Sequence, residues 1–142
     1  MARNTITIKG QGVRNERIAN ATIKPGALVE LMSTGKVRAH ATAGGNAQKA
    51  FAVEDDLQGK GIGDNYAADS RVQYNIFAPG DQVYAWLANA QNVAVGVFLE
   101  SAGGGELRAF GTGVPVAVAV EAVDMSDSDG ADPSGRIIVE VL

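Results

Sequence analysis

One stretch of the sequence has the residue types of a phosphate-binding loop. Gly59-Lys60-Gly61-Ile62-Gly63 supplies the flexible backbone and the cation that such loops use. The glycine spacing is not G-x-G-x-x-G, however, and no Lys-Ser/Thr pair closes the stretch. No helical pattern follows whose amino terminus would receive a phosphate. The sequence therefore predicts no nucleotide site here.

A second stretch resembles a calcium-binding loop by composition. It contains Asp124, Asp127, Asp129 and Asp132 within nine residues. When Asp129-Gly130 is aligned with positions 5 and 6 of the helix–loop–helix calcium motif, positions 1 and 12 fall on Met125 and Arg136. Those two positions require oxygen ligands. We therefore expect a solvated acidic turn, and no metal ligands.

The residues needed for nucleophilic or acid–base catalysis are also missing. The chain has no cysteine and no serine in a G-x-S-x-G elbow. His40 is its only histidine, and it shares one face of an expected strand, 36–41, with Lys36 and Arg38. A general base needs a partner that this spacing does not provide. The sequence predicts an exposed structural histidine, no catalytic residue, no cofactor and a non-enzymatic protein.

Composition and periodicity predict an all-β fold. The 142 residues suffice for one domain, and 46% are hydrophobic, with 18 glycines and 6% aromatics. Val83, Ala85 and Leu87 alternate with polar or aromatic neighbours, which is the period of a strand. Expected turns lie at 33–35, 79–80 and 103–105. We predict a single small sandwich or barrel-like β domain over residues 21–142, preceded by an extended arm.

Residues alternate between two faces in two further parts of the predicted domain. Residues 93–99 are expected to form one strand, with Val93, Val95, Val97 and Leu99 on a common face. Tyr84 and Trp86 share the face opposite Val83, Ala85 and Leu87. Two interpretations are open for this aromatic face, because it is either an exposed association surface or one side of a strand buried on both sides.

Residues 1–20 are predicted to be an extended basic arm. Residues 1–25 carry a net charge of +4, whereas the remainder carries −8. The basic residues of the arm are Arg3, Lys9, Arg14 and Arg17, and Ile6 and Ile8 lie in a short stretch able to add a strand to a sheet edge. The arm is expected to order only against a partner. Deleting residues 2–17 is then expected to preserve the fold and to weaken attachment.

The segment 54–70 is predicted to be a long functional loop. It shows no periodicity, is rich in glycine and aspartate, and exceeds the usual length of a connection. Its candidate contact residues are Lys60, Ile62 and Tyr66. Substitutions at Lys60 or Tyr66 are expected to weaken partner binding without unfolding the protein.

Membrane and direct nucleic-acid binding are not indicated. Residues 82–99 carry no formal charge, but Asn89, Gln91, Asn92 and Gly96 interrupt them, so a hairpin is expected instead of a span. The basic arm has no aromatic residue on which bases would stack.

Several stretches, in this order and spacing, resemble the decoration (cement) proteins of tailed-bacteriophage capsids. They are FAVEDDLQGKGI at 51–62, YAA at 66–68, FAPGDQV at 77–83, VAVAVEAVD at 116–124 and RIIVEV at 136–141. The resemblance covers roughly residues 20–142. It implies a small all-β protein that trimerises on the outer surface of the expanded head and clamps neighbouring major capsid subunits. It brings no catalytic residue.

A different class of function fits the same composition. A small β-barrel would hold a carbohydrate or another ligand in its mouth, with Tyr84 and Trp86 as stacking platforms. The state of association separates the two classes, because a ligand-binding barrel can be monomeric, whereas a decoration protein is expected to form a trimer or to assemble on its target.

Overall fold

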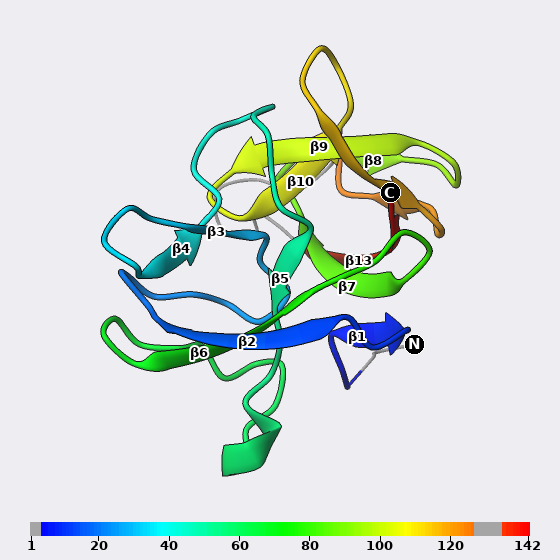
Figure 1. Ribbon diagram of the computed structural model, residues 1–142. Helices are drawn as coiled ribbons and strands as arrows, with labels where there is room; N and C mark the ends of the chain where they lie inside the picture. Colours follow the sequence, from blue (N-terminus) through cyan, green and yellow to red (C-terminus); the bar gives the residue numbers. More distant parts are fainter. Residues whose placement is uncertain (1–3, 127–134) are drawn as a thin grey trace.

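The computed structural model describes residues 4–126 and 135–142 and is built almost entirely of β-strands (Figure 1). The elements are β1 (Thr7–Lys9), β2 (Val13–Ile18), β3 (Val29–Leu31), β4 (Val37–Ala39), β5 (Ala50–Ala52), the 3₁₀ helix η1 (Asp56–Gln58), β6 (Arg71–Ile76), β7 (Gln82–Leu87), β8 (Asn92–Val93), β9 (Phe98–Gly103), β10 (Glu106–Ala109), β11 (Pro115–Ala119), β12 (Val123–Asp124) and β13 (Gly135–Val141).

Five of these strands close into a barrel. Their order is β7-β10-β9-β11-β13, and β13 returns to pair with β7 from Gly135↔Leu87 to Glu140↔Gln82. The pair β7–β10 is parallel and the other pairs are antiparallel. Closure leaves no free edge among the five strands. The predicted all-β domain of sandwich or barrel type is confirmed.

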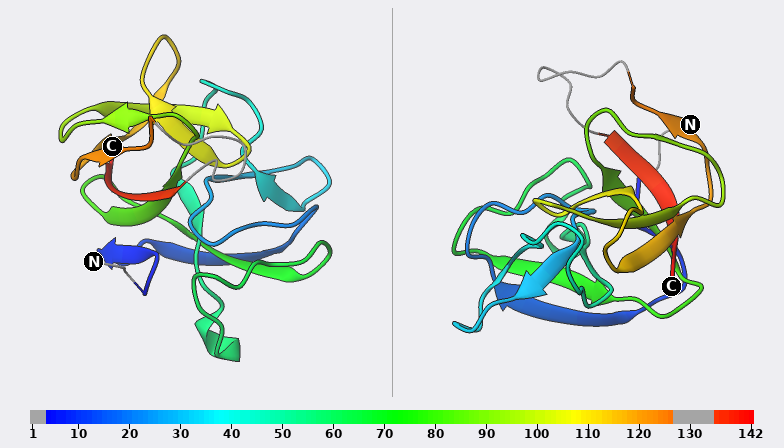
Figure 2. Two further views of the ribbon diagram at one scale, coloured as in Figure 1. Left: turned by 180° about the vertical axis from the view of Figure 1, so that it is seen from behind. Right: turned by 90° about the horizontal axis from the view of Figure 1, so that it is seen from above.

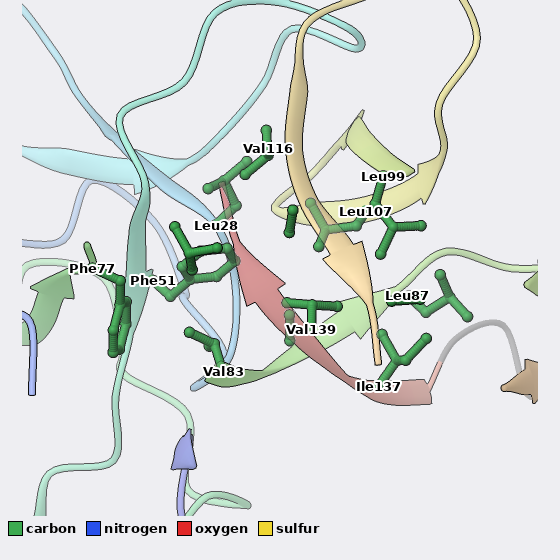
Figure 3. Packing of buried hydrophobic residues seen from close by; sticks show 14 of the residues in the cluster. Leu28, Phe51, Phe77, Val83, Leu87, Leu99, Leu107, Val116, Ile137 and Val139 are labelled. Atoms are coloured by element: carbon green, nitrogen blue, oxygen red, sulfur yellow. The ribbon is translucent and has the colours of Figure 1, made fainter. Parts of the chain in front are cut away.

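The barrel interior is filled by the inward-facing residues of its strands. Val83, Ala85 and Leu87 are fully buried, as their alternation predicts, and they meet Leu99, Leu107, Ile137 and Val139 (Figure 3). The cluster extends beyond the barrel through Leu28, Phe51 and Phe77. The rings of Phe51 and Phe77 pack edge to face with centroids 6.0 Å apart.

A second layer packs beside the barrel (Figure 2). It consists of the sheet β2-β6-β5 and the hairpin β3–β4. Its own cluster includes Val29, Val37, Val72 and Tyr74. The hairpin turns at 33–35, as predicted, and Gly35 adopts a positive φ there. The other expected turns, at 79–80 and 103–105, also lie between strands.

The strand predicted over 93–99 is wrong. β8 ends at Val93 and β9 begins at Phe98, with a turn between them in which Gly96 has a φ of +89°. Val95 is therefore 67% exposed and does not share a buried face with Leu99. A side chain at position 96 would be strained in this conformation, so the glycine breaks the alternation.

The amino-terminal segment is extended, as predicted, but it pairs with its own chain. β1 pairs with β7 through Thr7↔Val83, and β2 pairs with β6 along its whole length. Ile6 and Ala19 are fully buried. The prediction that this segment orders only on a partner is wrong for the described residues 4–20, because their backbone and apolar side chains already have partners in the chain.

The segment 54–70 is an ordered excursion that contains only η1 and one isolated bridge, Ile23↔Tyr66. It projects at the end of the molecule opposite to β9 (Figures 1 and 2). In the described part of the chain, no helix has the length and apolar character needed to cross a membrane.

Candidate partner-binding surfaces

The amino-terminal strands and the long loop meet and form one surface. Arg14 Nη1 lies 3.5 Å from Asp56 Oδ1, and the backbone N–H of Ile6 donates to the Glu54 carboxylate at 3.3 Å. We call β1, β2 and residues 54–70 the arm–loop surface. The sequence placed candidate contact residues in both segments, and the structure brings the two segments together.

A hollow of about 370 Å³ lies within the arm–loop surface, between the loop and the β2–β6 ribbon. Its lining includes Glu16, Asp55, Lys60, Tyr66, Arg71 and Gln73. Glu16 stands opposite Gln73 in the β2–β6 ladder, and the Gln73 side-chain amide donates to the Glu16 carboxylate. Lys60 therefore lies at a concave site, as a contact residue would.

The other predicted contact residues differ in accessibility. Lys9 and Arg17 are exposed, and Arg17 donates to the carbonyl of Gly35 at 3.3 Å. Ile8 is half-buried, whereas Ile6 is buried in the main core and cannot reach a partner. Arg3 lies outside the described residues.

Tyr66 is a structural residue. It is 6% exposed, and its hydroxyl donates to the carbonyl of Val53 at 2.6 Å. Burial raises the pKa of Tyr66 far above the neutral range, so it stays a hydrogen-bond donor. The prediction that substitution of Tyr66 spares the fold is therefore contradicted by its burial.

The Tyr84–Trp86 face is covered by side chains of the same protein. Trp86 Nε1 donates to the Pro25 carbonyl at 2.8 Å, and Lys24 Nζ and Arg136 Cζ lie 4.1 and 4.4 Å from the ring centroid. Arg136 Nη2 also donates to the carbonyl of Ile62 at 2.6 Å. Desolvation by burial lowers the pKa of Arg136. Trp86 is thus occupied by cation–π contacts and does not present a bare stacking platform.

An exposed apolar surface lies instead on the outer wall of the barrel. Phe98 and Phe110 are 47% and 43% exposed, and the N–H of Phe110 donates to the carbonyl of Phe98 at 2.8 Å. Val118 faces Phe98 from the other neighbouring strand. Directly opposed residues of paired strands share a face. We call Phe98, Phe110 and Val118 the apolar wall.

Sequence reasoning did not select the apolar wall. The sequence did place Phe98 on the strand face opposite Leu99. Because Leu99 is buried in the barrel, Phe98 has to point outward. Large exposed apolar side chains on adjacent strands usually mark association surfaces.

His40 is buried, and the prediction of an exposed histidine is wrong. It is 1% exposed, because β4 ends at Ala39 and the chain after it folds back over the imidazole. Nε2 lies 2.8 Å from the carbonyl oxygen of Asn46, and Nδ1 lies 2.8 Å from Ser101 Oγ. A carbonyl only accepts, so Nε2 carries a proton, and in the tautomer protonated at Nε2 alone Nδ1 accepts a hydrogen bond from the Ser101 hydroxyl.

Glu30 extends this contact chain, because its Oε1 lies 3.6 Å from His40 Nε2. A serine, a histidine and a carboxylate in sequence are the residue types of a hydrolase triad. Ser101 is fully buried, however, and its Oγ also accepts the N–H of Gly103 at 3.1 Å. No substrate carbonyl reaches Oγ in this arrangement. The group ties the loop after β4 to β9.

Glu100 forms a second buried polar cluster. It is 1% exposed, and one carboxylate oxygen accepts from Arg108 Nη2 at 2.9 Å while the other accepts the N–H groups of Gly111 and Gly113. A Cβ atom at Gly113 would lie 2.5 Å from Gly44 Cα, so only glycine permits this backbone contact. Glu100 thereby fixes the loop that carries Phe110 against β9.

Replacement of Glu100 by glutamine tests this cluster. Hydrogen bonds from Gly111 and Arg108 hold the pKa of Glu100 below its ordinary value. A carboxylate with a lowered pKa stabilises the fold above its unfolded pKa of about 4.3, and this contribution is lost as the pH falls through the lower folded pKa. We expect Glu100→Gln to reduce the free energy of unfolding at pH 7 by about 1–3 kcal/mol, because one acceptor is lost.

The measurement is urea unfolding at pH 7 and pH 3. The difference between wild type and Glu100→Gln should shrink at pH 3, where protonation weakens the wild-type cluster as well. Glu106→Gln is the matched control, because Glu106 makes one ion pair, with Lys24 at 3.5 Å. An equal loss from both variants at pH 7 would contradict the role assigned to Glu100.

Of the two motifs that suggested a ligand by composition, the structure describes the glycine-rich one and only the first residues of the calcium-like one. Gly59 has a left-handed backbone after η1, and no helix follows it in the described residues up to Ser70. Asp127, Asp129 and Asp132 of the calcium-like stretch lie outside the described residues. Among residues 4–126 and 135–142, no group of three or more His, Asp or Glu is placed to hold a metal ion.

A comparison of the chain with family models and with curated proteins finds no match.

Proposed function

We propose that this protein is a non-enzymatic decoration protein that binds the outer surface of the expanded head of a tailed bacteriophage and bridges major capsid subunits as a trimer. The observation that carries the proposal is the separation of two accessible surfaces. The 54–70 loop and β9, the strand that begins at Phe98, lie at opposite ends of the molecule (Figures 1 and 2). The sequence resemblance in residues 51–62 and 77–83 supports the same function.

The arm–loop surface suits attachment to the shell. It contains exposed cations, such as Lys9 and Lys60, and it is held in place by the Arg14–Asp56 ion pair and by buried Ile6. A surface that is already ordered loses little conformational entropy on binding. This rigidity favours binding to a repeated array of fixed sites.

The apolar wall suits self-association. Phe98 and Phe110 are aromatic, adjacent and exposed, which is the composition of an interface core. Glu100 anchors the loop after β10, so the position of Phe110 is fixed. We assign the wall to contacts between copies, and the arm–loop surface to contacts with the capsid.

Such a protein acts by mass action. A partner that binds the assembled shell but not its dissociated subunits stabilises the shell by about 2.7 kcal/mol per site at a hundredfold excess over the dissociation constant. Many equivalent sites would together resist the pressure of packaged DNA.

The test uses expanded, DNA-filled heads that lack the decoration protein. Heads incubated with the protein should release DNA at a higher temperature than bare heads. Lys60→Glu should reduce this shift, whereas Lys49→Glu, which lies outside the arm–loop surface, should preserve it. Equal release temperatures for decorated and bare heads would refute the proposed function.

A further inference from the structure

The hollow in the arm–loop surface has an unusual charge arrangement. Carboxylates and cations both line it, but within the described part of the chain no hydrogen bond or ion pair engages the side chains of Asp55, Lys60 or Arg71. Glu16 accepts only the amide of Gln73. Charges of both signs therefore face the same space without neutralising one another.

The walls of the hollow are fixed before any ligand arrives. Its floor is the β2–β6 ladder, in which Glu16 and Ile18 face Gln73 and Arg71. The loop is held by Tyr66, whose N–H and carbonyl both bond to Ile23. Gly61 N–H donates to Asp64 Oδ2 at 2.8 Å and closes the tip. The hollow is thus a preformed site.

The chemistry of the lining selects its ligand. Bringing an apolar or singly charged group against Asp55 and Arg71 would desolvate a charge without replacing its hydration. A ligand that carries both a positive and a negative group replaces the lost hydration of both side chains. The side-chain amide groups of Gln58 and Asn65, which also line the space, match the donors and acceptors of a peptide backbone.

We propose that this hollow binds an extended peptide segment of a partner protein that carries one basic and one acidic side chain close together. The inference deepens the proposed function, because it names the chemistry by which the arm–loop surface recognises its target. The volume of about 370 Å³ lies at the lower end of the range of about 300–1,000 Å³ for ligand pockets, so a short segment fits.

The probes are capped peptides titrated into the isotopically labelled protein and followed by NMR. The mixed-charge peptide is Ser-Arg-Ser-Glu-Ser, and the singly charged peptides replace either its arginine or its glutamate by glutamine. We expect the mixed peptide to shift amide signals of residues 55–67 and Gln73 and to bind about fivefold more tightly than either singly charged peptide, which is the effect of one further exposed ion pair. Added salt should weaken this preference.

Two variants and a control locate the effect. Asp55→Asn and Arg71→Gln should each reduce the affinity for the mixed peptide to that of a singly charged peptide. Lys49→Gln, outside the hollow, should leave it unchanged. All three side chains lack a hydrogen bond or ion pair among the described residues, so the fold should persist in each variant.

Three results would overturn the inference: no shift of these signals at millimolar peptide, equal binding of the uncharged Ser-Gln-Ser-Gln-Ser, or equal binding of an equimolar mixture of the two singly charged peptides. The mixture distinguishes one bipolar segment from two independent ions. Attachment to heads is measured separately, so the peptide inference can fail while the decoration function stands, and the reverse also holds.

Discussion

Replacing Ile6 with alanine should lower the free energy of unfolding by about 2–5 kcal/mol, the range for truncating a buried isoleucine to alanine. Ile6 is fully buried and packs in the main cluster, although it belongs to the predicted arm. Its carbonyl accepts the N–H of Tyr84 at 2.7 Å, which continues the pairing of β1 with β7. Removing the side chain would leave a cavity at the junction of the arm and the barrel.

Val13→Ala is the matched control, because it lies in the same segment but is 64% exposed. Its effect should stay within about 0.5 kcal/mol. Denaturant unfolding measures both variants. If Ile6→Ala and Val13→Ala behave alike, the arm is not part of the core. Deletion of residues 2–17 should unfold or strongly destabilise the protein, which reverses the expectation from sequence.

The sequence predicted those elements whose signal is local. The alternation of Val83, Ala85 and Leu87 identified β7 because a half-buried strand repeats every two residues. The turns at 33–35 and 79–80 were predicted from their glycines, because glycine tolerates the positive φ that such turns need. In the structure Gly35 and Gly80 adopt a positive φ. Each of these features depends on a few consecutive residues.

The arm was misjudged because its partners are distant in sequence. Arg14 and Glu16 pair with Asn75 and Gln73, about sixty residues away. The outer face of β2 is polar and therefore shows no apolar period, even though its backbone is paired. Burial of Ile6 depends on closure of the barrel, which no local pattern reports.

His40 and Trp86 show the same limit. A strand pattern tells which residues share a face, but it does not tell what covers that face. Asn46, in the loop after β4, and Ser101 of β9 both contact the buried His40 ring. Arg136 reaches Trp86 from the last strand. An exposed aromatic surface at Tyr84 and Trp86 was therefore one of two interpretations left open by the sequence, whereas the structure exposes Phe98 and Phe110.

Because Phe98 and Phe110 form the exposed aromatic surface, we expect substitution of Phe98 to disrupt association. In sedimentation experiments, wild-type protein should associate into trimers, and Phe98→Asp should convert it to a monomer. A carboxylate placed in an apolar interface has to be desolvated without a partner, which costs about 2 kcal/mol or more at each contact. In a closed trimer every copy contributes one such contact, so association should weaken by several orders of magnitude.

The folded monomer should survive this change, because Phe98 is 47% exposed and points away from the barrel interior. Phe110→Asp should act in the same direction, since the backbone of Phe110 is hydrogen-bonded to Phe98 at the end of the β9–β10 pair. Leu57→Asp is the control, because Leu57 is 77% exposed but belongs to the arm–loop surface at the other end of the molecule. A wild-type protein that stays monomeric both in solution and on heads would refute trimerisation. A Phe98→Asp variant that still forms trimers would place the interface elsewhere than on the apolar wall.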